Sequence, residues 1–360
     1  MRNLILAILS VLFLVTGAFA GEKDKVKAGF VYVGPVGDHG WSYRHDIGRL
    51  DVEEALGDRV ETTYVESVPE GADAERIFTQ MAMQGYDIIF GTSFGYMEPM
   101  LKVAKKFPNV KFEHATGYKQ APNMANYGLK LYQARHIQGL IAGKMTKTNK
   151  ICYVASYPIP EVIREINTYY LGAKKVNPDV ELKITWVFTW YDPAKEADAA
   201  KAMIEQGCDM VAQHTDSPAP LIAAEGAGVF GFGQASDQHK FAPKAQLTAT
   251  IDNWSPYYIA KVKAVLDGTW ETGDYFGDIN ECDATGCAVG MAPFTNLPQD
   301  VIDYVSDIRS QIAAGTYHAF TGPIRDNSGE LKLADGVIAD RAHLDSMMYY
   351  VEGINSEIPN

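Results

Sequence analysis

The chain has little cysteine, no run of basic residues and one long apolar run. Only 4 Cys occur among the 360 residues, and none lies close to the end of the N-terminal apolar segment, so we expect no lipid attachment there. The formal net charge is -13, and a nucleic-acid-binding face needs a basic stripe. The chain is long enough for two domains. From its charge we expect no nucleic acid as a partner.

The single apolar run is typical of a secretory signal peptide. Arg2 is the only charge in the first twenty residues, an apolar run extends from Leu4 to Val15, and the small-residue stretch Ala18 to Ala20 follows. A membrane span needs about 20 apolar residues, so this run is short for one, although an uncleaved anchor is the alternative. We expect residues 1–20 to be removed and the mature protein to be exported to the periplasm.

Familiar catalytic and metal-binding patterns are also missing. The sequence contains no G-x-S-x-G, no G-x-x-x-x-G-K-[ST] and no H-E-x-x-H, and "GFGQAS" lacks the full G-x-G-x-x-G spacing. Cys282 and Cys287 have no second ligand pair nearby, so in an oxidising compartment they are better suited to closing a small loop. We expect no enzyme, no catalytic residue, no metal and no cofactor.

Short apolar runs alternate with helical stretches, which predicts parallel sheets covered by helices on both faces. Predicted helices cover residues 43–56, 73–84, 97–107, 134–145, 161–176, 193–206, 219–227, 255–266, 301–314 and 339–353. The pattern restarts near residue 147 without a low-complexity linker. We expect two lobes joined by a hinge, the first from 26–146 plus about 250–280, the second from 147–248 plus about 285–355.

Ligands of open parallel sheets bind beyond the carboxyl ends of the strands. The segments that follow the predicted strands are rich in aromatic, carboxylate and amide side chains. With Asn253 they supply these candidate ligand-binding residues: Asp38, Trp41, Ser93, Phe94, Tyr132, Gln133, Tyr157, Trp190, Asp216, Gln234 and Asp237.

Two of these aromatics, Trp41 and Trp190, follow strands in opposite halves, so closing the lobes would place both rings on a flat ligand. Stacking a base on an aromatic ring contributes about 1–3 kcal/mol, and amides or carboxylates can then read the edge of the base. Structural roles are the alternatives: Trp41 as a cap of the first helix, Trp190 packed on Trp186, Asp216 as a helix N-cap, and Asp237 merely solvated.

Several stretches in order resemble the basic membrane protein family of ABC-transporter substrate-binding proteins, which includes purine-nucleoside receptors. They are "AGFVYVGPVGDHGWSYRHDIGR", "GLIAGKM", "EINTYYLGAKKVNP", "DPAKEADAAKAMIEQGCDMVAQ", "GQASDQ" and "GTYHAFTGPIRDNSG". The resemblance implies a type I periplasmic-binding fold, with two doubly wound α/β lobes, three hinge crossings and a ligand in the cleft.

The resemblance also implies roles for individual residues. Trp41 holds the place of a base-stacking aromatic, Trp190 or a neighbour that of a second one, and Asp237 that of an acidic residue. Nucleoside-binding members hold the ribose with a Lys where this chain has Asp252 or Asn253. The family is usually anchored through a Cys after the signal, which is missing here.

We therefore expect a monomeric periplasmic protein that captures a purine, a free base such as adenine rather than a nucleoside, for an ABC permease in the inner membrane. The alternatives are riboflavin or a sugar as the ligand, a ligand sensor for a receptor, or an exported nucleoside-processing enzyme.

Overall fold

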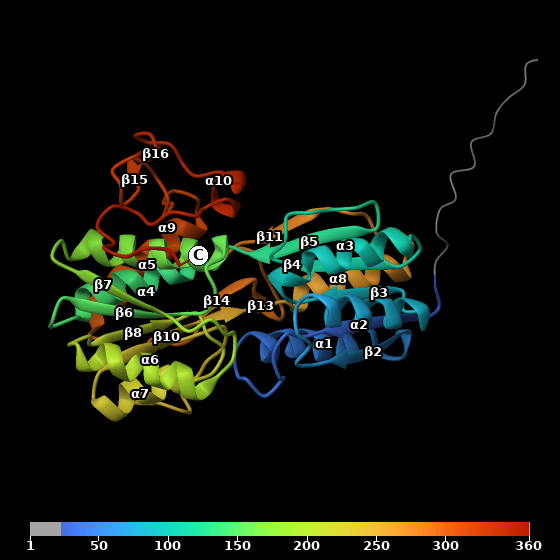
Figure 1. Ribbon diagram of the computed structural model, residues 1–360, viewed down its shortest axis with the longest axis horizontal. Coiled ribbons are helices and arrows are strands. Elements are labelled where there is room, and N and C mark those ends of the chain that lie inside the picture. Colours follow the sequence, from blue (N-terminus) through green and yellow to red (C-terminus); the bar gives the residue numbers. More distant parts are fainter. Residues whose placement is uncertain (1–22, 360) are drawn as a thin grey trace, which may run out of the picture.

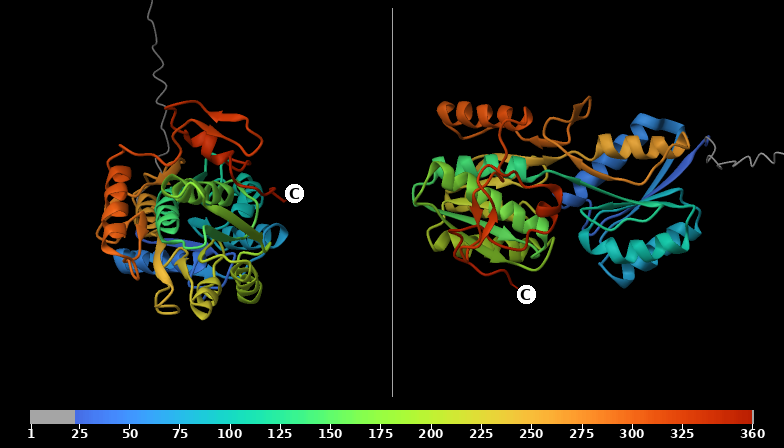
Figure 2. Two further views of the ribbon diagram at one scale, coloured as in Figure 1. Left: turned by 90° about the vertical axis from the view of Figure 1, so that its left-hand side faces the viewer. Right: turned by 90° about the horizontal axis from the view of Figure 1, so that it is seen from above.

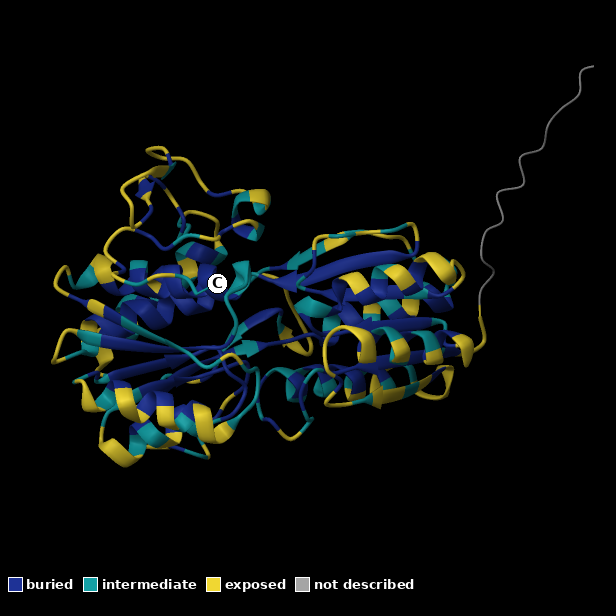
Figure 3. Ribbon diagram, in the orientation of Figure 1, coloured by how far each residue is buried: buried dark blue, intermediate teal, exposed yellow. Residues whose placement is uncertain are grey.

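The computed structural model describes residues 23–359, so the predicted signal peptide lies outside the described residues. The chain forms two lobes side by side, each built on a six-stranded sheet (Figure 1). The central strands of both sheets are almost entirely buried, the edge strands are partly exposed, and helices carry an exposed stripe on their outer side (Figure 3). This burial on both faces explains why the strands read as continuous apolar runs.

The first lobe holds a fully parallel sheet in the order β11-β5-β4-β3-β1-β2. One face is covered by α1 and α8 and the other by α2 and α3. The strands are β1 (Val26–Val31), β2 (Val60–Val65), β3 (Ile88–Gly91), β4 (Lys111–Ala115), β5 (Met124–Leu129) and β11 (Asp274–Gly277). The helices are α1 (Trp41–Leu56), α2 (Ala72–Met83), α3 (Met97–Lys106) and α8 (Ser255–Leu266), with short 3-10 turns at Gly57–Arg59 and Phe94–Tyr96.

The second lobe repeats this plan in the order β14-β10-β9-β8-β6-β7, with only β14 antiparallel. Helices α4 and α5 cover one face and α6 and α7 the other, while α9 packs outside α4. The strands are β6 (Lys150–Ala155), β7 (Glu181–Trp186), β8 (Met210–Gln213), β9 (Phe230–Gly233), β10 (Gln246–Asp252) and β14 (Val289–Met291). The helices are α4 (Tyr132–Met145), α5 (Pro160–Val176), α6 (Pro193–Glu205), α7 (Ala219–Ala227) and α9 (Gln299–Ala313).

The chain passes between the lobes after β5, after β10 and after β11, so the predicted multi-crossing hinge is present (Figure 1). One predicted limit differs from the structure. We placed residues 26–146 in the first lobe, but α4 packs on α5, α9, β10 and β14 and belongs to the second. The first crossing is therefore the short link between β5 and α4, because the apolar faces of α4 and α5 bury each other.

Hydrogen bonds tie the first crossing to the third. The Lys130 ammonium lies 2.6 Å from Asp278, and Gln133 Nε2 donates to the same carboxylate at 3.2 Å. Gln133 Oε1 accepts the backbone N–H of Ile279 at 3.0 Å. We call residues 130–133 and 278–279 the hinge ribbon, because these bonds join the two crossing segments into one unit.

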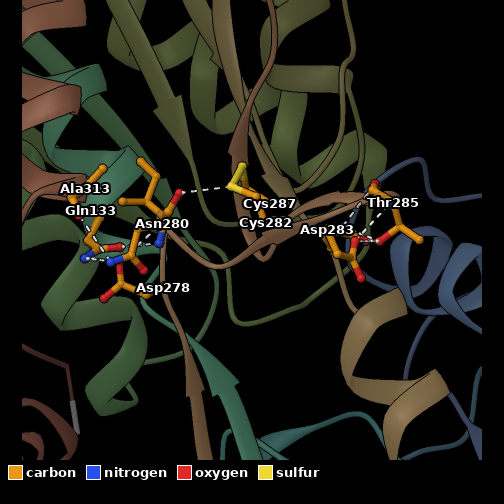
Figure 4. Close-up of a disulfide and its surroundings, with 10 residues drawn as sticks. Gln133, Asp278, Asn280, Cys282, Asp283, Thr285, Cys287 and Ala313 are labelled. Carbon is orange, nitrogen blue, oxygen red and sulfur yellow. Dashed lines mark hydrogen bonds between the residues drawn. A yellow bond between two sulfur atoms is a disulfide. The ribbon is translucent and has the colours of Figure 1, made fainter.

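The third crossing carries a small loop closed by a disulfide between Cys282 and Cys287 (Figure 4). The loop folds as a hairpin of β12 (Cys282–Asp283) and β13 (Gly286–Cys287). The pairing is the one that the turn-forming "DATG" between the two cysteines indicates. The other two cysteines, Cys152 and Cys208, are free and buried.

The prediction of a last helix over residues 339–353 is wrong except for one turn. Only α10 (Arg341–Asp345) forms, and the rest of the segment after α9 is an irregular arm on the second lobe, with the short strands β15 (Ile324–Arg325) and β16 (Leu331–Leu333) (Figure 2). The backbone of Val351 bridges to Asp326 and donates to Asn167 Oδ1 at 3.0 Å, and these bonds replace the helical ones.

Glycines allow α4 and α5 to pack closely. A Cβ on Gly139 would lie 2.0 Å from the carbonyl oxygen of Tyr169, and one on Gly172 would lie 2.4 Å from that of His136. Distances this short cannot be tolerated without moving a backbone. The pair of glycines therefore sets how closely the two helices approach.

We expect Gly139→Ala to lower the free energy of unfolding by about 1–3 kcal/mol or more, because the added methyl group must push α5 away. Gly226→Ala in α7 is the matched control, since nothing lies within 4 Å of its Cβ position. There alanine should be neutral or stabilising by up to about 1 kcal/mol. Urea unfolding followed by circular dichroism measures both, and equal effects would contradict the packing argument.

Candidate functional site

A cavity lies between the lobes, at the carboxyl ends of both sheets. The first lobe contributes the segments after β1, β3 and β4, and the second lobe those after β6, β7, β8 and β9. The lining residues are Val33, Trp41, Ser93, Phe94, Thr116, Ile159, Glu161, Trp190, His214, Asp216 and Gln234.

Six of the twelve predicted ligand-binding residues line this cavity. They are Trp41, Ser93, Phe94, Trp190, Asp216 and Gln234. The structure thus brings together the aromatic residues of both lobes with one carboxyl and one amide from the second lobe. The prediction missed Val33, Thr116, Ile159, Glu161 and His214, although Ile159, Glu161 and His214 fall within the segments that follow predicted strands.

Trp41 opens α1 and is held by the first lobe. Its Nε1–H donates to the Thr92 carbonyl oxygen at 2.6 Å, and its ring lies edge-on against Trp254 at 5.2 Å between centroids. The side chain is only half buried because it also lines the cavity. The ring therefore both packs at the start of the helix and faces the cleft.

Asp38 has a structural position just before α1. Its buried carboxylate accepts the backbone N–H groups of Gly40, Ser42 and Tyr43 at 2.8, 2.9 and 3.0 Å. Burial raises the pKa of Asp38 to about 6, although these donors act in the opposite direction. The residue predicted to contact ligand thus lies outside the cavity lining and holds the loop that presents Trp41.

The opposite wall comes from the loop after β7. Trp190 lies 5.1 Å from Tyr157 between ring centroids, and no ring pair joins it to Trp186 among the described residues. The Trp190 carbonyl oxygen accepts the Asp216 backbone N–H at 2.9 Å. This bond connects the aromatic wall to the carboxyl-bearing loop after β8.

The Gln234 side chain is oriented by a buried guanidinium. Arg135 Nη2 donates to Gln234 Oε1, its Nη1 donates to Gln138 at 2.7 Å, and its Nε contacts Glu165 at 3.2 Å. All four side chains are buried. With its oxygen engaged, Gln234 has its amide N–H groups left for the cavity.

Asp216 is fully buried and is not the N-cap of α7, where no side chain caps the helix. Its Oδ2 has no hydrogen-bond partner within residues 23–359. A Cβ on Gly40 would lie 2.4 Å from the Asp216 carbonyl oxygen, so the two lobes touch here. Burial and the nearby carboxyls of Asp38 and Glu196 raise the pKa of Asp216 well above its usual value.

His214 and Glu161 add a second polar group to the lining. Their side chains approach to 3.7 Å, and His214 Nδ1 lies 3.4 Å from the Tyr153 hydroxyl. Both residues come from the second lobe, beside Asp216 and Gln234. The polar side of the cavity therefore belongs mainly to the second lobe.

The remaining predicted residues lie elsewhere. Tyr132 and Gln133 are in the hinge, and Tyr157 lines a groove at the cleft mouth with Val33 and Trp190. Asp237 is exposed and accepts from Gln246 Nε2 at 2.7 Å, and Asn253 bonds Thr285 in the third crossing. Asp192 caps α6, as expected, by accepting the Lys195 N–H at 3.1 Å.

The C-terminal arm reaches from the second lobe to the first beside this cavity. The Arg341 guanidinium lies 3.7 Å from the centre of the Phe276 ring and 3.4 Å from Asp274, both on β11. On the other side Asp345 approaches Arg164 of α5 at 3.5 Å. Arg341 therefore links the arm to the opposite lobe.

We expect Arg341→Gln to weaken closure slightly, because it removes a cation–π contact and an ion pair that together contribute about 1–2 kcal/mol. Ligand affinity should fall by up to about tenfold, and the loss should shrink as salt rises. Titration calorimetry at two salt concentrations measures this. Arg325→Gln on β15 is the control, and an equal effect of both changes would contradict a link between the lobes.

Three comparisons with known proteins agree with this geometry. A family model described as the PnrA-like ABC transporter substrate-binding protein matches residues 25–314. A purine-binding protein of Brucella abortus is 51% identical over 96% of this chain and 97% of that protein. A putative ABC transporter glucose-binding protein of Haloferax volcanii is 37% identical over 96% of this chain and 84% of that protein.

Among solved structures, an ABC transporter solute-binding protein of Aeropyrum pernix superposes with a TM-score of 0.72 at 19% identity, covering 89% of this chain and 96% of that one. This likeness confirms the predicted type I periplasmic-binding fold. Within residues 23–359 no helix is long and apolar enough to cross a membrane, and no group of side chains could hold a metal ion.

Proposed function

Since the chain belongs to the PnrA-like family of ABC transporter substrate-binding proteins, we propose that it captures a purine, with a free base such as adenine favoured, for import through an ABC permease. We further propose that it is exported to the periplasm as a monomer. Its partners are then a small-molecule ligand and the permease in the inner membrane.

The observation that carries this proposal is the pair of aromatic walls on opposite lobes. Trp41 and Phe94 line the cavity from the first lobe and Trp190 from the second, with Asp216 and Gln234 at the polar side. Aromatic faces suit a flat heterocycle, and amide and carboxyl groups suit its edge. The relative from Brucella abortus, half identical to this chain, carries the name of a purine-binding protein.

Two features favour a base over a nucleoside. The described lining of the cavity contains no lysine that could hold a ribose. Asn253, one of the two residues aligned with the expected lysine, uses its amide on Thr285.

A sugar is the second candidate. The relative from Haloferax volcanii, 37% identical, is named as a putative glucose-binding protein. Sugars also stack on aromatic rings, but a hexose presents hydroxyl groups around its whole rim. The lining has aromatic rings from both lobes, and four of its six polar residues come from the second lobe, which suits a base better.

The test is titration calorimetry of protein unfolded and refolded to remove carried ligand, with adenine, guanine, hypoxanthine, adenosine, inosine, riboflavin and glucose. We expect tight binding of a free base and weaker binding of its nucleoside. Tight glucose binding without purine binding would overturn the proposal in favour of the second candidate. Release of free base from adenosine during incubation would instead indicate an enzyme.

We expect Trp41→Ala to lower base affinity by about 5- to 150-fold, since one stacking contact contributes about 1–3 kcal/mol. Trp41→Phe keeps an aromatic face but loses the bond to Thr92, so it should retain most of the affinity. Ile222→Ala on the exposed side of α7 is the control. Unchanged binding by Trp41→Ala would exclude the stacking role.

A further inference from the structure

Asp216 is an unusual group to find in the lining of a ligand cavity. The residue is fully buried, it lines the cavity, and its Oδ2 has no hydrogen-bond partner among the described residues. Leaving a buried polar atom unpaired costs about 1–3 kcal/mol, more for a charge. An unpaired carboxyl oxygen in a cavity lining therefore indicates a place where a ligand supplies the missing partner.

Burial and the groups around Asp216 make a negative charge there unfavourable, although the backbone N–H of Trp41 bonds the Asp216 carboxyl and acts to lower its pKa. Carboxyls approach from three elements: Asp38 before α1, Glu196 on α6 and Asp252 at the end of β10. Tyr191 also lies near enough to interact with Asp216, and Glu161 and His214 share the cavity lining.

In the part of the chain that the structure describes, no cation pairs with Asp216 to offset the charge of these neighbouring carboxyls. Asp38 is engaged by backbone N–H groups, and Glu196 accepts from the Ser217 backbone at 3.1 Å. Arg44 donates to the backbone oxygen of Asp252 at 2.7 Å, and no ion pair with Asp216 occurs in the described residues. Like charges this close cannot all ionise, so the protonated form of Asp216 is favoured.

We propose that Asp216 reads the edge of the purine as a neutral carboxylic acid, donating its proton to a ring nitrogen and accepting an N–H from the same edge. The inference rests on the proposed function and adds a specificity-determining residue to it.

A neutral acid and a carboxylate recognise different edges. The acid presents one donor beside one acceptor, whereas the carboxylate only accepts. Adenine presents an acceptor beside a donor at N7 and the 6-amino group, at N1 and the same amino group, and, as a free base, at N3 and N9–H. A carboxylate instead suits two adjacent donors, such as the N1–H and 2-amino groups of guanine.

The Gln234 side chain is consistent with this proposed role of Asp216. Its oxygen is engaged by Arg135, so its amide N–H groups are donors toward the cavity. A second donor beside a donor–acceptor pair matches a base with several ring-nitrogen acceptors. Adenine and guanine both provide such acceptors at N3 and N7, so Gln234 supports a purine, and the preference for adenine over guanine comes from the donor–acceptor pair of Asp216.

The test is Asp216→Asn, because asparagine is close in shape to the neutral acid and keeps one donor and one acceptor. We expect Asp216→Asn to bind adenine within about threefold of the unchanged protein, and Asp216→Ala to bind at least tenfold more weakly. Asp198→Asn, the same chemical change on the exposed side of α6, is the matched control. Circular dichroism verifies the fold of each variant.

The protonation state is measured directly by infrared difference spectroscopy of the adenine complex. We expect a carbonyl band of a protonated carboxylic acid that disappears in Asp216→Asn. Affinity should be greatest below the raised pKa of Asp216 and should fall about tenfold per pH unit above it, while that of Asp216→Asn stays level. The comparison is made over the pH range in which adenine itself stays neutral.

Equal losses in Asp216→Asn and Asp216→Ala, or only carboxylate bands in the complex, would overturn the inference while leaving purine binding intact. Unchanged adenine binding by Asp216→Ala would also overturn it. If the unchanged protein binds no purine at all, the proposed function fails first. These outcomes are therefore distinguishable in one set of titrations.

Discussion

The position of Gln234 in the cleft depends on one buried guanidinium, that of Arg135. Arg135 lies at the start of α4, directly after the first crossing, and engages Glu165 of α5, Gln138 one turn later and Gln234 after β9. Removing one partner of a buried ion pair typically costs 3–5 kcal/mol, because the other charge is left uncompensated. This network therefore sets the position of the cavity-lining Gln234 amide and the packing of α4 on α5 together.

The two walls of the cleft are held in different ways. In the first lobe, Asp38 caps α1 with three backbone bonds and so fixes the loop that carries Trp41. In the second lobe, a backbone bond between Trp190 and Asp216 joins the loops after β7 and β8. Each wall is rigid within its own lobe, so closing the lobes changes the distance between preformed surfaces more than their shapes.

Much of the fold and about half of the site follow from the sequence. Alternating apolar and helical periods predict both sheets, and the rule that ligands bind beyond the carboxyl ends of strands finds Trp41, Trp190, Asp216 and Gln234. Local patterns do not show which side chain a tertiary contact engages. Asp38 and Asp237 therefore look like ligand contacts, while His214 reads as an ordinary polar residue.

The two structural misjudgements have the same cause. Helix α4 follows a first-lobe strand in sequence, but glycine contacts with α5 place it in the second lobe. The segment 339–353 has a helical pattern, but Asn167 and Asp326 bind the backbone of Val351. Long-range partners decided both outcomes, and a window of neighbouring residues contains no information about them.

The hinge ribbon has a consequence for how affinity can vary. Lys130 and Gln133 both hold Asp278, so two of the crossing segments bend as one strip. For a protein that must close to bind, the apparent dissociation constant is the intrinsic constant divided by the closed fraction. That fraction depends on the free-energy difference between open and closed forms, to which the bonds of the hinge ribbon contribute. Two chains with the same cavity lining can therefore differ in apparent affinity through residues that never touch the ligand.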